Sequence, residues 1–259
     1  MSSQLLSFVE AYQATLWHGF IVFLRIGAVM SVLPAFGEQS VPLRVKLALA
    51  LAFTLVVTPA LPVMQPVATM SFQAITPFLL TEPVIGLALG VGFRLFVIAL
   101  QTAGVIAAQA LSLSQILGGS AVDPMPALGQ VLVVAGLALA VMAGLHVQVA
   151  RAMVLSYTLL PMGQFPDPSD LSSWGIAQIG KSFSLAFSLS APFLIVSFLY
   201  NLTLGVINRA MPQLMVAFVG APAITLGALV LLMLLAPVML TAWLEALRVF
   251  AENPFGSTP

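Results

Sequence analysis

The chain has 259 residues, of which 61% are hydrophobic and only 6% charged, and its formal net charge is zero. Soluble globular chains carry about 25% charged residues, so this composition excludes an ordinary soluble domain. Equal numbers of basic and acidic residues offer no basic surface to nucleic acid, and the lack of cysteine excludes disulfides and thiolate chemistry.

Three long uncharged stretches cover residues 47–81, 95–122 and 210–244. A helix needs roughly 20 apolar residues to cross the hydrocarbon core of a bilayer. In lipid every backbone amide must be satisfied within the protein, which leaves helices or closed barrels. The runs are continuous and rich in Leu and Ala, without the alternation of a barrel strand. The sequence therefore predicts an all-α, membrane-associated protein.

About six long hydrophobic helical blocks, separated by breaks, are expected along the chain. The first covers residues 14–33 and ends before Pro34, and the second covers residues 43–61. No Lys or Arg precedes the first apolar run, so it is not a cleavable signal and should remain in the mature chain. The third block opens at Pro77 and at Glu82-Pro83, because proline suits a first helical turn. It reaches residue 117, with Gly104 as a candidate break.

The second half of the chain follows the same plan. A fourth block is expected over residues 127–160, followed by the polar loop 164–173. The fifth covers residues 176–209, with a kink at Pro192, because proline removes a helical hydrogen bond. The sixth covers residues 213–251 and is interrupted at Pro222 and Pro237.

Glu82, Gly86, Gly90 and Arg94 recur every four residues, which places them on one ridge of a helix. The two glycines form a small-xxx-small pattern that allows a neighbouring backbone to approach closely. Generic helix packing explains the glycines alone. The charges at the ends demand partners on another helix or in a water-lined cavity, because an ionisable group in an apolar segment costs about 3 kcal/mol.

A second ridge comprises Asn201, Gly205 and Arg209, where Arg209 can meet the exposed carbonyls of a helix end. Arg25 is isolated in the first block and must snorkel or pair with an acid. Glu38 and Asp123 are both candidates for that acid.

Catalytic and metal-binding patterns are absent from the sequence. His18 and His146 have no further ligand at metal-binding spacing in their own helices. No nucleophile elbow, Walker loop or zinc-protease motif occurs. We therefore expect no enzyme activity, no cofactor and no nucleic-acid partner.

The positive-inside rule does not orient the blocks. If all six span, six of the eight basic residues divide three to three between the sides. Arg44, Lys46 and Arg209 lie on one side, and Arg151, Lys181 and Arg248 lie on the other. Two explanations remain open. Either the topology signals are weak, or the blocks bury their apolar faces against protein partners instead of spanning singly.

Several short patterns together resemble the FliR family over nearly the whole chain. They are FLRIG (23–27), VPLRVK (41–46), EPVIGLALG (82–90), AGVIAAQ (103–109), Asp123-Pro124, GLH (144–146), Ser156-Tyr157, Pro161-Met162-Gly163 and LGVINRAMPQL (204–214). The last is the most specific, through its Gly205, Arg209 and Pro212-Gln213 spacing. Asn201 and Met215 depart from the acid and the asparagine often found in that family.

This resemblance implies a non-enzymatic core subunit of the flagellar type III protein export gate. It implies assembly with FliP-like and FliQ-like subunits, a neighbouring FlhB-like switch subunit, and contact with membrane lipids and with unfolded flagellar substrates in transit. The expected place is the bacterial inner membrane within the flagellar basal body. The equivalent subunit of a virulence injectisome and a small-molecule secondary transporter are the alternatives, although transporters usually show two related halves.

The resemblance also implies a division of the chain. Residues 1–163 correspond to a FliP-like four-helix portion, 164–175 to a connecting loop and 176–251 to a FliQ-like hairpin, with 252–259 as a flexible tail. A breaker cluster between the third and fourth blocks is the candidate pore plug. Its residues are Gly118, Gly119, Ser120, Asp123 and Pro124. A plain interhelical turn is the alternative for this segment.

Overall fold

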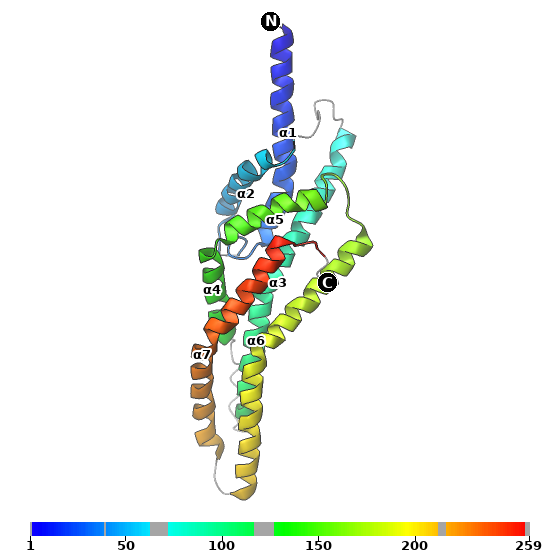
Figure 1. Cartoon of the computed structure of the whole chain (residues 1–259). Coiled ribbons are helices and arrows are strands. Elements are labelled where there is room, and N and C mark those ends of the chain that lie inside the picture. The colour runs from blue at the N-terminus through cyan, green and yellow to red at the C-terminus, as the bar shows by residue number, and fades with distance from the viewer. Residues whose placement is uncertain (1, 39, 63–71, 117–126, 212–215, 257–259) are drawn as a thin grey trace. The chain divides into compact units, whose positions relative to one another are not determined.

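The structure is a computed structural model that describes residues 2–38, 40–62, 72–116, 127–211 and 216–256 (Figure 1). Within these ranges the chain forms helices and no strand, which confirms the predicted all-α class. The elements are α1 (Ser2–Val32), α2 (Leu43–Val57), the 3-10 turn η1 (Thr58–Ala60), α3 (Phe72–Ile116), α4 (Ala127–Met142), α5 (Leu145–Leu159), α6 (Pro168–Ala210) and α7 (Val216–Glu252).

Helix length and hydropathy agree with the predicted membrane association. Five segments are long and apolar enough to span a bilayer, and the helices on either side of Gly144 provide a sixth if they form one bent span. The protein is therefore a helical membrane protein.

Helix α3 differs from the expected third block. It begins at Phe72, so Pro77 and Pro83 lie inside the helix and not in its first turn. Proline is tolerated in apolar helices where neighbouring groups satisfy the freed carbonyls. The helix also continues through Gly104, so the candidate break at this position was wrong.

The expected fourth block is two helices. Gly144 has φ +81°, a left-handed conformation that residues with a Cβ rarely adopt, and it separates α4 from α5. The sequence prediction was wrong here because an isolated glycine in an apolar run does not reveal which conformation it adopts.

The two C-terminal helices differ from the expected blocks. Helix α6 begins at Pro168, inside the predicted polar loop, and the Asp167 carboxylate accepts a hydrogen bond from the Ser169 amide at 2.8 Å as an N-cap. Helix α7 is continuous through Pro222 and Pro237, so the predicted interruptions were wrong.

The start of the expected flexible tail contacts the protein. Trp174 donates its indole N–H to the Pro254 carbonyl at 2.8 Å, and its ring lies 5.2 Å from the Phe255 ring. Residues 253–256 therefore pack against α6, and the tail residues after Gly256 lie outside the described chain.

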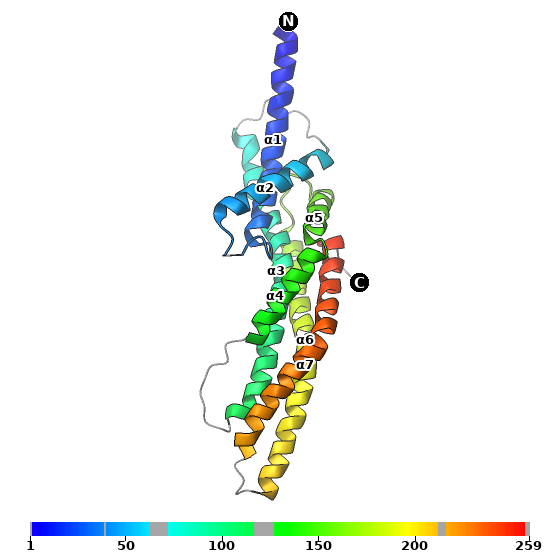
Figure 2. The ribbon, with the colours of Figure 1, turned by 90° about the vertical axis from the view of Figure 1, so that its left-hand side faces the viewer.

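The chain divides into two compact units. Unit 1 comprises residues 1–95, 141–178 and 247–259, and unit 2 comprises residues 96–140 and 179–246. In unit 1, α2 lies across α1 (Figure 2). The end of α7 joins this unit through Phe250, whose ring meets Phe93 edge to face at 5.1 Å. Gly92 makes room for that ring, since a Cβ there would collide with it.

Unit 2 is a bundle in which α6 and α7 run lengthwise as a hairpin (Figure 1). Gly104 and Gly129 bring the backbones of α3 and α4 into direct contact. The Trp243 side chain is buried and donates to the Phe96 carbonyl at 2.8 Å, which joins α7 to α3. Ser197 of α6 donates to the Ala110 carbonyl of α3.

Unit 2 leaves large apolar side chains exposed along α6 and α7. On α6 they are Ile179, Phe183, Phe187, Ile195, Val196, Phe198, Leu199, Leu202 and Val206. On α7 they are Leu226, Leu229, Val230, Met233, Leu234 and Val238. Contiguous exposed apolar surface of this kind marks contact with lipid or with protein partners.

Candidate functional site

The predicted ridge on α3 lies along α1. A Cβ at Gly86 would lie 2.9 Å from the Cβ of Ala28 and would collide with the Arg25 carbonyl. A Cβ at Gly90 would lie 3.0 Å from the Val29 carbonyl oxygen. Both glycines therefore sit where the two helices approach most closely, and any larger residue would force them apart.

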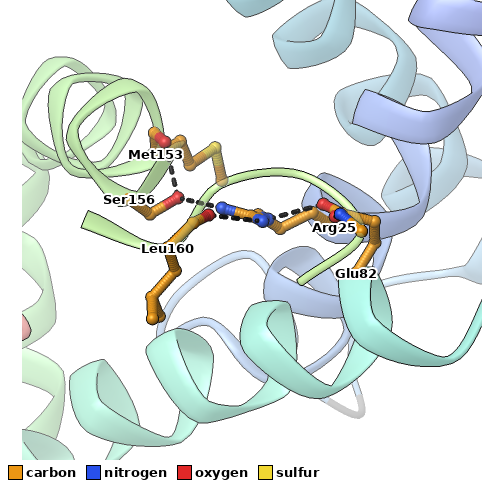
Figure 3. A network of polar contacts seen from close by, with 6 residues as sticks. Arg25, Glu82, Met153, Ser156 and Leu160 are labelled. Carbon is orange, nitrogen blue, oxygen red and sulfur yellow. Dashed lines mark hydrogen bonds and ion pairs between the residues drawn. The ribbon is translucent and has the colours of Figure 1, made fainter. Parts of the chain in front are cut away.

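The acidic end of the ridge pairs with the isolated arginine of α1. The Arg25 Nε donates to Glu82 Oε2 at 2.7 Å, and both side chains are fully buried (Figure 3). Glu38 was a candidate partner of Arg25, and that interpretation was wrong. Arg25 and Glu82 both stand inside apolar segments, but no local pattern in the sequence links them across 57 residues.

Three further groups complete the surroundings of Arg25. Its Nη1 donates to the Ser156 hydroxyl at 3.1 Å, and its Nη2 donates to the Leu160 carbonyl at 3.0 Å (Figure 3). The guanidinium carbon lies 3.8 Å from the centroid of the Tyr157 ring, a cation–π geometry. The Ser156 hydroxyl in turn donates to the Met153 carbonyl at 2.7 Å.

Glu82 also holds the turn that follows α5. Its Oε1 accepts a hydrogen bond from the Gly163 amide at 3.0 Å. Gly163 has φ +73°, and its Cα faces the Phe78 ring so closely that a Cβ would lie 2.6 Å from it. Only glycine meets both constraints without strain.

The Arg25 cluster, defined as Arg25, Glu82, Ser156, Tyr157 and Gly163, therefore joins α1, α3, α5 and the turn at 161–163. Each carboxylate oxygen accepts one hydrogen bond, and each guanidinium nitrogen donates one. A buried ion pair is stable only when its remaining polar groups are satisfied in this way. Because these bonds join three helices and a turn, the geometry of the cluster fixes the positions of the helices.

The basic end of the ridge forms a second ion pair. Arg94 Nη1 donates to Glu38 Oε1 at 2.7 Å, and the two side chains are 33% and 28% exposed. Beside it, the Lys46 ammonium donates to the Gly37 carbonyl at 2.8 Å. The loop between α1 and α2 is thus fastened to α3 and to the first turn of α2.

Other predicted site residues lie apart from this cluster. A Cβ at Gly205 would meet no described atom within 4 Å, and Arg209 is exposed at the end of α6. Arg209 has no ion pair within the described ranges. The remaining predicted residues lie outside the described chain, namely Gly118, Gly119, Ser120, Asp123, Pro124, Pro212 and Gln213.

The described part of the chain holds no group of three His, Asp or Glu side chains able to bind a metal ion. Its polar interior consists of fixed ion pairs and of hydrogen bonds that join apolar helices. Together with the five long apolar helices, these features define an all-α membrane protein.

Comparison with known proteins identifies the class more closely. A family described as "Bacterial export proteins, family 1" matches residues 16–249. The flagellar biosynthetic protein FliR of Caulobacter vibrioides is 30% identical over 93% of this chain and 96% of its own length. The Escherichia coli FliR is 32% identical over 87% of this chain and 84% of its own. The Bacillus subtilis FliR is 26% identical over 92% of this chain and 90% of its own length.

The chain belongs to the FliR family of bacterial export proteins, as its sequence patterns predicted. It is a membrane component of the flagellar export apparatus, in a family of structural and transport proteins that is not a known enzyme family.

Proposed function

We propose that this protein is a core subunit of the flagellar type III export gate in the bacterial inner membrane. With FliP-like and FliQ-like subunits, and beside an FlhB-like switch subunit, it forms the entrance channel for unfolded flagellar substrates. Family membership over residues 16–249 supports the export role. The partners come from the family resemblance.

The observation that carries the assembly part of this proposal is the apolar surface of unit 2. Phe198 and Leu202 are 68% and 57% exposed, one helical turn apart on α6, and Leu234 on α7 is 67% exposed. Association between apolar helices in a membrane depends on close packing, so the exposed apolar faces of α6 and α7 can pack against a second helical hairpin. Residues 176–251 are the portion that we propose corresponds to a FliQ-like hairpin, and residues 1–163 to a FliP-like portion.

Purification of the affinity-tagged full-length chain in mild detergent tests the assembly. The expected result is co-purification of FliP-like and FliQ-like subunits. The pair Phe198→Ala and Leu202→Ala should lower their yield, whereas Leu43→Ala, an exposed residue of α2, is the matched control. A stable, monodisperse wild-type monomer that binds neither subunit would overturn the proposal.

Secretion assays separate the flagellar role from its alternatives. Deletion of the gene should abolish motility and the release of flagellar filament and hook proteins. Loss of virulence-effector secretion with normal motility would instead indicate an injectisome subunit. Loss of uptake of a small solute, with normal secretion of both kinds, would indicate a transporter.

We also propose that the segment around residues 108–126 plugs the closed channel. Gly118-Gly119 permit backbone conformations that other residues resist, and Asp123-Pro124 favours a turn. Asp123 is the one charged residue of this segment. The rest of the segment is uncharged, which suits a seal against ions.

A further inference from the structure

Helix α5 borders two adjoining hollows within unit 1. The first is an apolar groove of about 390 Å³ between the end of α2 and α5, here called the α2–α5 groove. Val56 and Val57 line it from α2, and Ala150 and Val154 line it from α5. The volume is within the range of about 300–1,000 Å³ that is typical of small-molecule sites.

The second hollow is polar and lies between α5 and the end of α7. This α5–α7 cavity has a volume of about 480 Å³ and is lined by Gln148, Arg151, Arg248 and Glu252. Arg151 and Leu155 line both the groove and the cavity. A single ligand with an apolar part and a polar part can therefore occupy both.

The charges of the α5–α7 cavity favour an anion. Arg151, Arg248 and Glu252 bring two guanidinium groups and one carboxylate to it, and Arg248 already has a partner within the chain. Arg151 is exposed and makes no hydrogen bond or ion pair with any described residue, and its helix can enter the membrane as one half of a bent span. A charged side chain at such a position costs about 3 kcal/mol unless it meets a counter-charge or water.

Gln148 adds a requirement for a hydrogen-bond donor. Its Nε2 donates to the Ala143 carbonyl at 3.3 Å, which identifies Oε1 as the free acceptor. That Oε1 is buried and has no hydrogen-bond partner in the protein. A ligand bearing a hydroxyl beside an anionic group would satisfy Gln148 and Arg151 together, since buried polar groups are normally hydrogen-bonded.

We propose that the α2–α5 groove and the α5–α7 cavity together bind one anionic glycerophospholipid of the phosphatidylglycerol type. The phosphodiester lies against Arg151 and Arg248, a glycerol hydroxyl donates to Gln148 Oε1, and one acyl chain lies in the groove. Basic pockets between membrane helices bind phospholipid headgroups in this manner. This site goes beyond the proposed export function and does not depend on it.

Two features favour this ligand over other occupants. A phosphodiester supplies oxygen acceptors for the Arg151 guanidinium, and the glycerol headgroup supplies a hydroxyl donor for Gln148 Oε1 that a choline headgroup lacks. A helix of a protein partner would fill the groove, but it would need an acidic and a hydroxyl-bearing side chain aligned at the same end. A phospholipid carries both groups next to its acyl chains.

Photolabelling of the full-length chain tests the site. The chain is purified from its membrane with its accompanying subunits and placed in phosphatidylcholine nanodiscs. These contain a trace of phosphatidylglycerol or phosphatidylcholine that bears a photoreactive group on one acyl chain. The phosphatidylglycerol probe should label peptides from residues 56–60 and 147–158 in preference to the phosphatidylcholine probe.

The double variant Arg151→Gln/Arg248→Gln should weaken this labelling about 25-fold, about fivefold for each arginine removed near a headgroup. Arg151→Lys/Arg248→Lys keeps both charges and should retain most of the labelling. Arg44→Gln removes an exposed arginine outside both hollows and is the matched control. Ala150→Phe should block the groove and reduce labelling with both arginines in place.

Equal labelling by the two probes would overturn the proposal, as would undiminished phosphatidylglycerol labelling in the arginine double variant. Protection of these peptides by an accompanying subunit, without phosphatidylglycerol labelling, would assign the hollows to a protein contact and overturn it as well. Co-purification of the gate subunits is measured in a separate assay, so a negative photolabelling result leaves the export proposal unaffected.

Discussion

Replacement of Arg25 by methionine tests the Arg25 cluster most directly. The substitution leaves the Glu82 carboxylate fully buried without its ion-pair partner and removes the donor to the Leu160 carbonyl. Breaking a buried pair by removing one partner costs about 3–5 kcal/mol. For a chain of this size that corresponds to a fall in Tm of roughly 6–20 °C.

The assay is a thermal ramp on the detergent-purified full-length protein, followed by size-exclusion chromatography of what remains folded. Arg25→Met/Glu82→Gln should be more stable than Arg25→Met alone, because no charge is left buried and the glutamine Oε1 can still accept from the Gly163 amide. Arg44→Met is the control, since Arg44 is exposed and surface substitutions usually stay within about 0.5 kcal/mol.

Two results would refute this reasoning. One is an Arg25→Met protein whose Tm matches that of the Arg44→Met control. The other is a double variant that is less stable than the wild type by the sum of the two single losses, because coupled partners cannot give additive effects.

Three further predictions concern packing, assembly and sealing. Gly86→Ala should lower the free energy of unfolding by about 1–3 kcal/mol, because the added Cβ would collide with α1. Gly205→Ala is the control, because a Cβ there meets open space and should not destabilise the protein. Equal Tm values for the two variants would contradict the close approach of α1 and α3. Arg209→Ala should reduce the yield of the assembled complex more than Arg44→Ala does, because Arg209 requires a partner charge in the complex. The yield is measured by pull-down of the FliP-like subunit, and equal yields would argue against that partner. Removal of Gly118–Ser120, with Pro124 retained, should leave assembly intact but make the membrane leaky to small ions; wild-type conductance would show that this segment is only a connector.

Composition was sufficient to predict the class of fold. Long uncharged runs have few solutions in a bilayer, so an all-α membrane protein follows from residues 47–81, 95–122 and 210–244 alone. Helix ends were less predictable. Proline and glycine signal breaks in soluble helices, yet α7 continues through Pro222 and Pro237 while Gly144 ends a helix. In apolar surroundings, packing against neighbours decides which of these residues interrupts a helix.

The site was predictable in part. Four-residue spacing placed Glu82, Gly86, Gly90 and Arg94 on one ridge, and the structure lays this ridge against α1. The charge partners were not predictable, because Arg25 and Glu82 are 57 residues apart and no local pattern links them. The role of Gly163 was also hidden, since its need for a positive φ arises from a turn that Glu82 holds from another helix.

The 57-residue separation within the Arg25 cluster has a consequence for biogenesis. Ribosomes add about 5–20 residues per second, so Arg25 is synthesised roughly 3–11 s before Glu82. During that interval the Arg25 charge has no acid to neutralise it, at a cost of about 3 kcal/mol in a membrane. The insertion machinery or the headgroup region must therefore solvate the arginine of α1 until α3 is inserted beside it. Its final position is fixed only when the turn at Gly163 closes over the pair.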